Sequence, residues 1–234
     1  MQQLVIPFLQ SSMICLSILK TIQFLKDKNI VSSEISRKMI HTAIGMVYTI
    51  SWRLYPDSYY SRFIMGMVPA VFAFQFSLIG LGIIHDPKTV NSMSRSGKPS
   101  ELLKGPVAYG LLIAILTMYY WFDSPIGLIS ILILSIGDGC SAITGILYGK
   151  RRLPYNRSKT YVGTTGFFIC SFIGTYIILN ILSSFLVTPV VSIVPSLFIT
   201  CMVSAFVESL PFFAEWDNVT VTLASILTLK TLGW

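Results

Sequence analysis

An aspartate in the middle of an apolar segment is the residue of this sequence most clearly placed to do chemistry. Asp138 lies between two glycines, and residues 125–149 contain no other charged side chain. A carboxylate is costly in a membrane-spanning segment, so it is expected there only where it serves a function. Carboxylate oxygens are ligands that Mg²⁺ prefers, and Asp138 is therefore a candidate metal ligand.

A stripe of small residues leads from Asp138 to a basic loop. On one helix, Gly145 and Gly149 share a face with Asp138, and Gly163 opens a similar stripe in the next apolar segment. Such stripes can simply pack two helices closely. Alternatively, their backbone N–H groups can bind phosphate oxygens together with neighbouring cations. The loop between the two segments carries five cations: Lys150, Arg151, Arg152, Arg157 and Lys159.

Two further carboxylates lie near the end of the chain. Glu208 belongs to the apolar segment 190–210, and Asp217 precedes the last apolar segment. With Asp138 they could supply oxygen ligands to a metal ion, while the loop cations bind phosphates. This set suits a nucleotide bound with Mg²⁺. Salt bridges between the same carboxylates and cations are the alternative interpretation.

The N-terminal half adds basic residues beside its apolar segments. Arg37 and His41 are four residues apart and share a helix face, with Lys38 beside them. His41 is either a phosphate contact or proton acceptor, or an ordinary histidine at the membrane interface. Arg95 and Lys104 lie in a polar loop rich in turn residues and hydroxyl groups. They are candidate phosphate ligands or solvated loop cations.

The elements that must hold these residues are membrane helices. Of the 234 residues, 53% are hydrophobic and 12% are charged, whereas a soluble domain has about 25% charged residues. We predict an all-α, polytopic transmembrane bundle of seven or eight spans that forms a single domain, residues 1–234. The expected spans cover about residues 3–25, 39–55, 62–84, 106–122, 125–149, 162–186, 190–210 and 218–233.

Basic residues are concentrated in alternate loops. Thirteen of the 17 lysines and arginines lie in the loops that follow the first, third and fifth expected spans. The positive-inside rule places these loops on the cytosolic face, or its stromal equivalent in an organelle, and the N-terminus outside. The candidate cations and carboxylates then face one side of the membrane. The sequence leaves open which membrane this is.

Taken together and in this order, the motifs resemble the polyprenol kinase family, which includes phytol kinase, farnesol kinase and, more distantly, dolichol kinase. The resemblance covers roughly residues 35–225 and includes all the catalytic motifs. It rests on five stretches: Arg37-Lys38-x-x-His41, residues 94–106 (Ser-Arg-Ser-Gly and Glu-Leu-Leu-Lys-Gly-Pro), residues 137–150 (Gly-Asp-Gly to Gly-Lys), residues 158–164 and residues 207–220.

The resemblance implies a lipid kinase that transfers the γ-phosphate of a nucleotide, commonly CTP with Mg²⁺, to an isoprenoid alcohol in the bilayer. Phytol, farnesol and geranylgeraniol are possible acceptors, and no nucleic-acid partner is expected. The implied catalytic residues are Asp138, Lys150, Lys159 and His41. The implied phosphate ligands are Arg37, Lys38, Arg95, Lys104, Gly145, Gly149, Arg152 and Gly163, and the implied metal ligands are Asp138, Glu208 and Asp217.

Two other functions use a similar set of residues. A membrane cytidylyltransferase that makes a CDP-lipid would need the same metal, nucleotide and lipid, but it would release pyrophosphate. A transporter of an anionic substrate could use Asp138 as a coupling site and would hydrolyse no nucleotide. The products of the reaction therefore distinguish these alternatives from the kinase.

Overall fold

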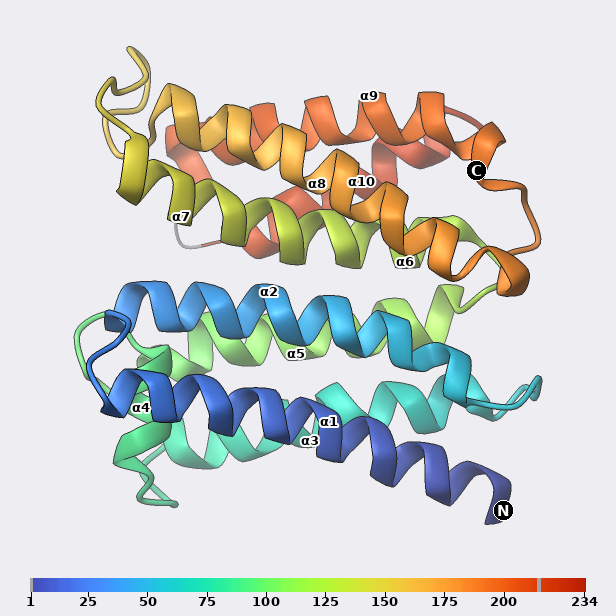
Figure 1. Cartoon of the computed structure of the whole chain (residues 1–234), viewed down its shortest axis with the longest axis horizontal. Coiled ribbons are helices and arrows are strands. Elements are labelled where there is room, and N and C mark those ends of the chain that lie inside the picture. Colours follow the sequence, from blue (N-terminus) through green and yellow to red (C-terminus); the bar gives the residue numbers. More distant parts are fainter. Residues whose placement is uncertain (1, 214–215) are drawn as a thin grey trace. The chain divides into compact units, whose positions relative to one another are not determined.

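The computed structural model of the chain describes residues 2–213 and 216–234, which fold into helices (Figure 1). The described residues contain no β-strand, only an isolated bridge between Arg152 and Thr160. The chain divides into two compact units, Met1–Tyr119 and Tyr120–Trp234, and each is described by itself. The predicted all-α fold is confirmed.

The first unit contains four long helices and a short one. They are α1 (Gln2–Asp27), α2 (Ser33–Ser51), α3 (Ser61–Gly80), α4 (Pro87–Met93) and α5 (Glu101–Tyr120). Side chains such as Leu19, Ile40, Ile79 and Leu102 form one apolar core. The Tyr48 hydroxyl is also buried, and it shares a 2.9 Å hydrogen bond with the Thr117 hydroxyl. Burial of this polar group is therefore compensated inside the unit.

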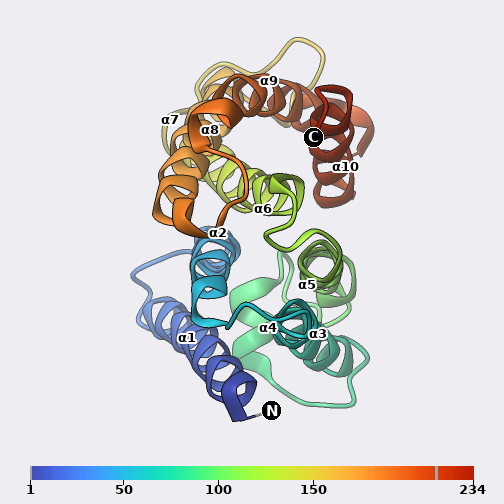
Figure 2. The same cartoon turned by 90° about the vertical axis from the view of Figure 1, so that its right-hand side faces the viewer.

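The second unit is built around one long, buried helix. It runs from α6 (Pro125–Leu132) through a π-helical segment (Ile133–Gly137) into α7 (Asp138–Tyr148). Of its most apolar 18 residues 83% are buried, against 28–44% in the other helices of comparable length and hydropathy. Figure 2 shows α8 (Tyr161–Ile181), α9 (Val190–Ser209) and α10 (Asp217–Thr231) around this helix. The helix that carries Asp138 is thus the centre of its unit.

Six helices in the described part of the chain are long and apolar enough to cross a membrane. They correspond to six of the spans expected from the sequence. The expected spans 39–55 and 218–233 coincide with α2, which carries three charged residues, and with α10, which has 15 residues. A count of seven or eight spans, the outside N-terminus and the single domain over residues 1–234 stay predictions.

Several helices begin earlier than their apolar residues do. α2 starts at Ser33 because the Ser32 hydroxyl accepts a hydrogen bond from the N–H of Ile35 at 3.3 Å. The expected loop 85–105 contains α4, whose first turn is capped by the Asp86 carboxylate and begins with Pro87. Capping residues therefore extend helices into polar sequence that hydropathy assigns to loops.

Candidate active site

Asp138 is buried inside the central helix of the second unit. It is 6% exposed and is the first residue of α7, directly after the π-helical segment. The flanking glycines do not interrupt the helix. Gly137 instead makes room for a neighbouring ring, since a Cβ atom on it would lie 2.6 Å from the Phe167 side chain. π-helical turns are rare in proteins, but those that occur often lie at functional sites. The turn before Asp138 therefore agrees with a role for this carboxylate.

Glu208 and Lys159 form an ion pair close to the loop end of this helix. Glu208 is near the end of α9 and 4% exposed, and its Oε1 atom accepts a hydrogen bond from the Lys159 ammonium. The same oxygen accepts a hydrogen bond from the hydroxyl of Ser141 at 3.0 Å. Ser141 lies three residues after Asp138 on α7, so this contact ties α9 to the helix that carries Asp138. The alternative interpretation of Glu208, a salt bridge to a loop cation, is therefore present in the structure, and its role as a metal ligand stays a prediction.

Three carboxylates act on the single ammonium group of Lys159. Burial by itself lowers the pKa of Lys159, but the charge and the hydrogen bond of Glu208 raise it, as do the charges of Asp138 and Asp217. The balance places the pKa above its ordinary value, so Lys159 is fully charged at neutral pH. The charges of three carboxylates that the sequence separates by up to 79 positions thus act on one ammonium group.

The loop between α7 and α8 turns Lys159 inward and leaves its other cations outside. The backbone N–H of Leu153 donates to the carbonyl of Lys159 at 3.0 Å, and the Leu153 side chain is buried. Lys150 and Arg152 are exposed, and the Arg152 guanidinium donates to the Ser158 carbonyl at 3.3 Å. Arg151 and Arg157 are exposed too. Exposed cations beside a carboxylate cluster can reach the phosphates of an incoming ligand.

The predicted phosphate-binding glycines lie at the contact between α7 and α8. A Cβ atom on Gly163 would lie 3.0 Å from the carbonyl oxygen of Ser141 and 3.0 Å from the Thr160 hydroxyl. One on Gly145 would lie 3.3 Å from the Thr160 hydroxyl, and one on Gly149 would collide with the Gly145 carbonyl. Close helix packing therefore accounts for these glycines, and phosphate binding by them stays a prediction.

The remaining site residues expected from the sequence belong to the first unit. Arg37, Lys38 and His41 lie on α2, and Lys104 lies on α5. The His41 ring stacks on Tyr109 with centroids 3.9 Å apart, and the Tyr109 hydroxyl donates to the His41 carbonyl at 2.8 Å. These contacts give His41 a packing role within its own unit. Its participation, and that of the three cations, in the site around Asp138 stays a prediction.

Glu101 connects the two halves of the polar stretch 94–106. Its carboxylate accepts hydrogen bonds from the N–H of Arg95 at 2.5 Å, from the N–H of Ser96 at 3.1 Å and from the Ser96 hydroxyl. Gly97 follows with φ of 78°, a left-handed conformation that favours glycine. The side chain at the start of α5 thus fixes the loop that carries Arg95.

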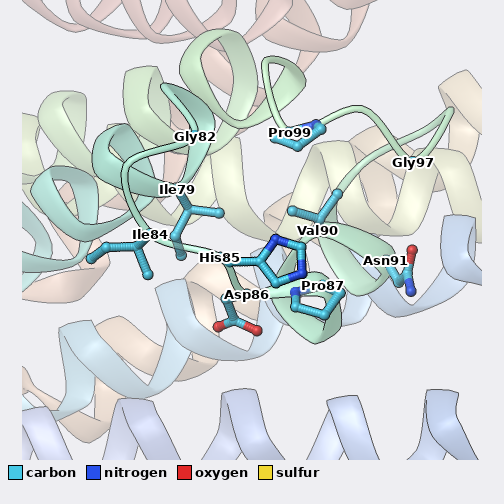
Figure 3. Close-up of a pocket in the computed structure, with 10 residues that line it drawn as sticks. All are labelled: Ile79, Gly82, Ile84, His85, Asp86, Pro87, Val90, Asn91, Gly97 and Pro99. Atoms are coloured by element: carbon cyan, nitrogen blue, oxygen red, sulfur yellow. The ribbon is translucent and has the colours of Figure 1, made fainter.

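A small pocket lies beside this loop. It has a volume of about 180 Å³, and the imidazole of His85 stands among its lining residues (Figure 3). Val90 and Pro99 give it an apolar wall. Sites for drug-sized ligands usually measure about 300–1,000 Å³, so this pocket is smaller than such sites.

A metal ion bound by the carboxylates of the second unit stays a prediction, and an ion that arrives with phosphates would need fewer protein ligands. Within residues 2–213 and 216–234, no three His, Cys, Asp or Glu side chains are grouped closely enough to hold a metal by themselves. Mg²⁺ in phosphoryl-transfer enzymes is usually held by one or two carboxylates, with phosphate oxygens and water completing its shell. Within the described part of the chain, Oε2 of Glu208 is buried without a hydrogen-bond partner and offers such an oxygen. Asp138 or Asp217 would supply a second one.

Sequence reasoning missed the uncharged members of the site. Ser141 could have been found, because it follows Asp138 by three residues and shares its helix face. Asn156 and Ser209 gave no such signal. Their hydrogen bond joins residues 53 positions apart and exists only in the folded chain.

Comparisons with known proteins were made at the levels of family, structure and sequence. No protein-family model matches the chain, and no solved structure matches it. Among curated proteins, the probable phytol kinase 3, chloroplastic, of Glycine max is 34% identical over 219 residues, 93% of this chain and 69% of the relative. The farnesol kinase, chloroplastic, of Arabidopsis thaliana is 34% identical over 202 residues, 86% of this chain and 66% of the relative.

A third relative agrees with these two. Phytol kinase 1, chloroplastic, of Arabidopsis thaliana is 32% identical over 206 residues, 87% of this chain and 68% of the relative. The matched lengths are large enough to include the residues of both units. The chain therefore belongs to the phytol kinase and farnesol kinase family.

Proposed function

We propose that this protein is a membrane-embedded kinase of isoprenoid alcohols. The observation that carries the proposal is the ion pair between Lys159 and the buried Glu208, among helices apolar enough to cross a membrane, with the charges of Asp138 and Asp217 also acting on Lys159. Phosphoryl transfer requires charge neutralisation and positioning more than covalent chemistry by the protein, and this cluster supplies both. The names of the relatives supply the class of acceptor, a prenyl alcohol such as phytol or farnesol.

The acceptor suits the position of the cluster. An isoprenoid alcohol keeps its chain in the bilayer and its hydroxyl at the interface, where helix ends and loops meet water. Asp138, buried in the helix that leads to the loop between α7 and α8, accepts the proton of that hydroxyl. The alcohol oxygen then bonds to the γ-phosphorus, the bond from this phosphorus to the bridging oxygen breaks, and the nucleoside diphosphate leaves.

The cations and carboxylates divide the remaining tasks. Lys150 and Arg152 bind the negatively charged phosphates, and Lys159 stays beside the carboxylates and orients Glu208. Mg²⁺ bound with the nucleotide neutralises phosphate charge, and Glu208 together with Asp138 or Asp217 would hold it. We take CTP as the donor, on the strength of the family resemblance.

The membrane and the face on which the site lies follow from the charge distribution and from the names of the relatives. The three basic loops face the cytosol or the stroma, because cations accumulate on that side of membrane proteins. The three relatives described above are named as chloroplastic, and this favours a plastid membrane for the present chain. Immunogold labelling or fractionation of the tagged protein in its native cells tests this placement.

A donor-by-acceptor assay tests the activity. The purified protein in lipid nanodiscs is incubated with CTP, ATP, UTP or GTP labelled at the γ-phosphate, and with phytol, farnesol, geranylgeraniol or dolichol. We expect a labelled prenyl monophosphate together with a nucleoside diphosphate. With a prenyl monophosphate offered in place of the alcohol, release of labelled pyrophosphate and formation of a CDP-lipid would instead identify a cytidylyltransferase. Absence of a labelled lipid with every pair would overturn the proposal.

A further inference from the structure

The loop between α7 and α8 is attached to the end of α9 by two side chains that precede Lys159 by three and four residues. Asn156 is 7% exposed, and its Nδ2 donates to the carbonyl of Ser209 at 2.9 Å. The hydroxyls of Tyr155 and Ser209 share a second hydrogen bond of 2.9 Å. The last carbonyls of a helix have no partner within it, so Asn156 also caps α9.

Asn156 is connected to both members of the ion pair. Ser209, which it binds, follows Glu208 directly in the chain. On the other side, the Asn156 carbonyl accepts the N–H of Lys159 at 3.2 Å. Its side-chain Oδ1 accepts the N–H and the hydroxyl of Ser158 at 3.1 and 2.6 Å. Hydrogen bonds within residues 156–159 therefore fix the shape of the turn, and the hydrogen bond to Ser209 attaches the turn to α9.

We infer that Asn156, assisted by Tyr155, is a positioning residue that holds Lys159 against Glu208. A lysine has a long and flexible side chain, and fixing it costs conformational entropy that a rigid backbone anchor reduces. The anchor on Ser209 ties the backbone of Lys159 to the helix end that carries its partner. This inference rests on the proposed function only for its effect on phosphate transfer, because the anchoring itself is a property of the fold.

The variant Asn156→Asp isolates the link to α9. Its two oxygens still accept from Ser158, but neither can donate to the Ser209 carbonyl. We expect kcat to fall by about 10- to 100-fold, as for other losses of positioning groups, while KM for the prenyl alcohol stays unchanged. Asn180→Asp is the matched control, since Asn180 is exposed and donates to the Tyr176 carbonyl at 2.8 Å. It should keep the kcat of the wild type.

A second readout requires no enzymatic activity. Acetylation of Lys159 by an N-hydroxysuccinimide ester, followed by mass spectrometry of its peptide, reports whether the ammonium is held against Glu208. We expect severalfold faster acetylation in N156D, a smaller increase in Tyr155→Phe, and no change in N180D. Should N156D not accumulate as folded protein, Y155F is assayed in its place. Faster acetylation of Lys159 in N156D, together with a wild-type protein that phosphorylates no alcohol, would contradict the proposed function but support the anchoring role of Asn156.

Unchanged acetylation and unchanged kcat in N156D would overturn the inference. So would equal rises at Lys159 in N156D and in the N180D control, because that result would mean a general loosening of the protein. A fall of kcat accompanied by a proportional fall in folded protein, with Lys159 still protected, would also assign Asn156 a purely structural role.

Discussion

The ion pair between Lys159 and Glu208 leads to an asymmetric effect on stability. The Glu208 side chain is 1% exposed, whereas the Lys159 side chain is 24% exposed. Lys159→Met therefore leaves a buried carboxylate without its cation, and breaking a buried pair in this way costs about 3 kcal/mol. Glu208→Gln leaves a lysine that can extend into water and an amide that still accepts from Ser141, so we expect about 1 kcal/mol.

Thermal unfolding of the purified protein in detergent measures this difference. For a chain of this size 1 kcal/mol corresponds to about 2–4 °C, so K159M should lower the apparent Tm by about 6–12 °C and E208Q by about 2–4 °C. The double variant contains neither charge and should lose less stability than the two single losses added together. Lys150→Met removes an exposed cation of the same loop and should change Tm by less than about 1 °C.

Two results would refute this reasoning. A loss in E208Q as large as that in K159M would show that Lys159 cannot reach water and that burial of Glu208 does not decide the effect. A double variant whose loss equals the sum of the single losses would show that the two charges are not coupled. Activity is measured below the lowest Tm, so that loss of folding does not mimic loss of phosphate transfer.

Three further predictions concern the rest of the site. Asp138→Asn should lower kcat by about 100-fold or more, because the amide neither accepts the proton nor binds the metal as a charge, while membrane insertion and Tm stay near wild type; near-normal activity would remove Asp138 from the mechanism. Gly163→Ala should cost about 1 kcal/mol, since its Cβ atom meets the Ser141 carbonyl at 3.0 Å, whereas Gly105→Ala, with nothing within 4 Å, should cost nothing measurable by Tm. Removal of divalent cations with EDTA should abolish phosphate transfer and leave Tm unchanged, because the metal comes with the nucleotide; a drop in Tm would reveal a structural metal instead.

Hydropathy and composition were sufficient to predict the helices but not their first turns. Long apolar runs such as residues 162–186 and 190–210 coincide with α8 and α9 because burial in lipid or protein requires a continuous helix. The starts of α2 and α4 depend instead on single capping side chains, Ser32 and Asp86, whose hydrogen bonds lie in polar sequence. The π-helical segment before Asp138 has no signature in residue type, since it arises from a local change of backbone pairing.

For the candidate site, the sequence was sufficient to predict which charged residues are candidates, but not which cation of the loop points inward. From the sequence, Asp138, Glu208, Asp217 and the loop cations are candidates for one shared chemistry. In the fold, Glu208 pairs with Lys159, and the charges of Asp138 and Asp217 also act on this lysine. The sequence alone offers no reason to separate Lys159 from the four other cations of its loop. That distinction comes from the turn anchored by Asn156, a neutral residue whose partner is 53 positions away.

The charges of the site explain why its loop needs both an inward and several outward cations. Counted as ionised, the three carboxylates and the ammonium of Lys159 leave two negative charges, which one Mg²⁺ bound as we propose would neutralise. The negative charges of a triphosphate then have no partner within the cluster. Exposed cations at the loop surface are placed to pair with these phosphate charges: Lys150, Arg151, Arg152 and Arg157. Lys159 therefore neutralises charge of the protein's own carboxylates, and under the proposed function its neighbours on the same loop remain available to the nucleotide.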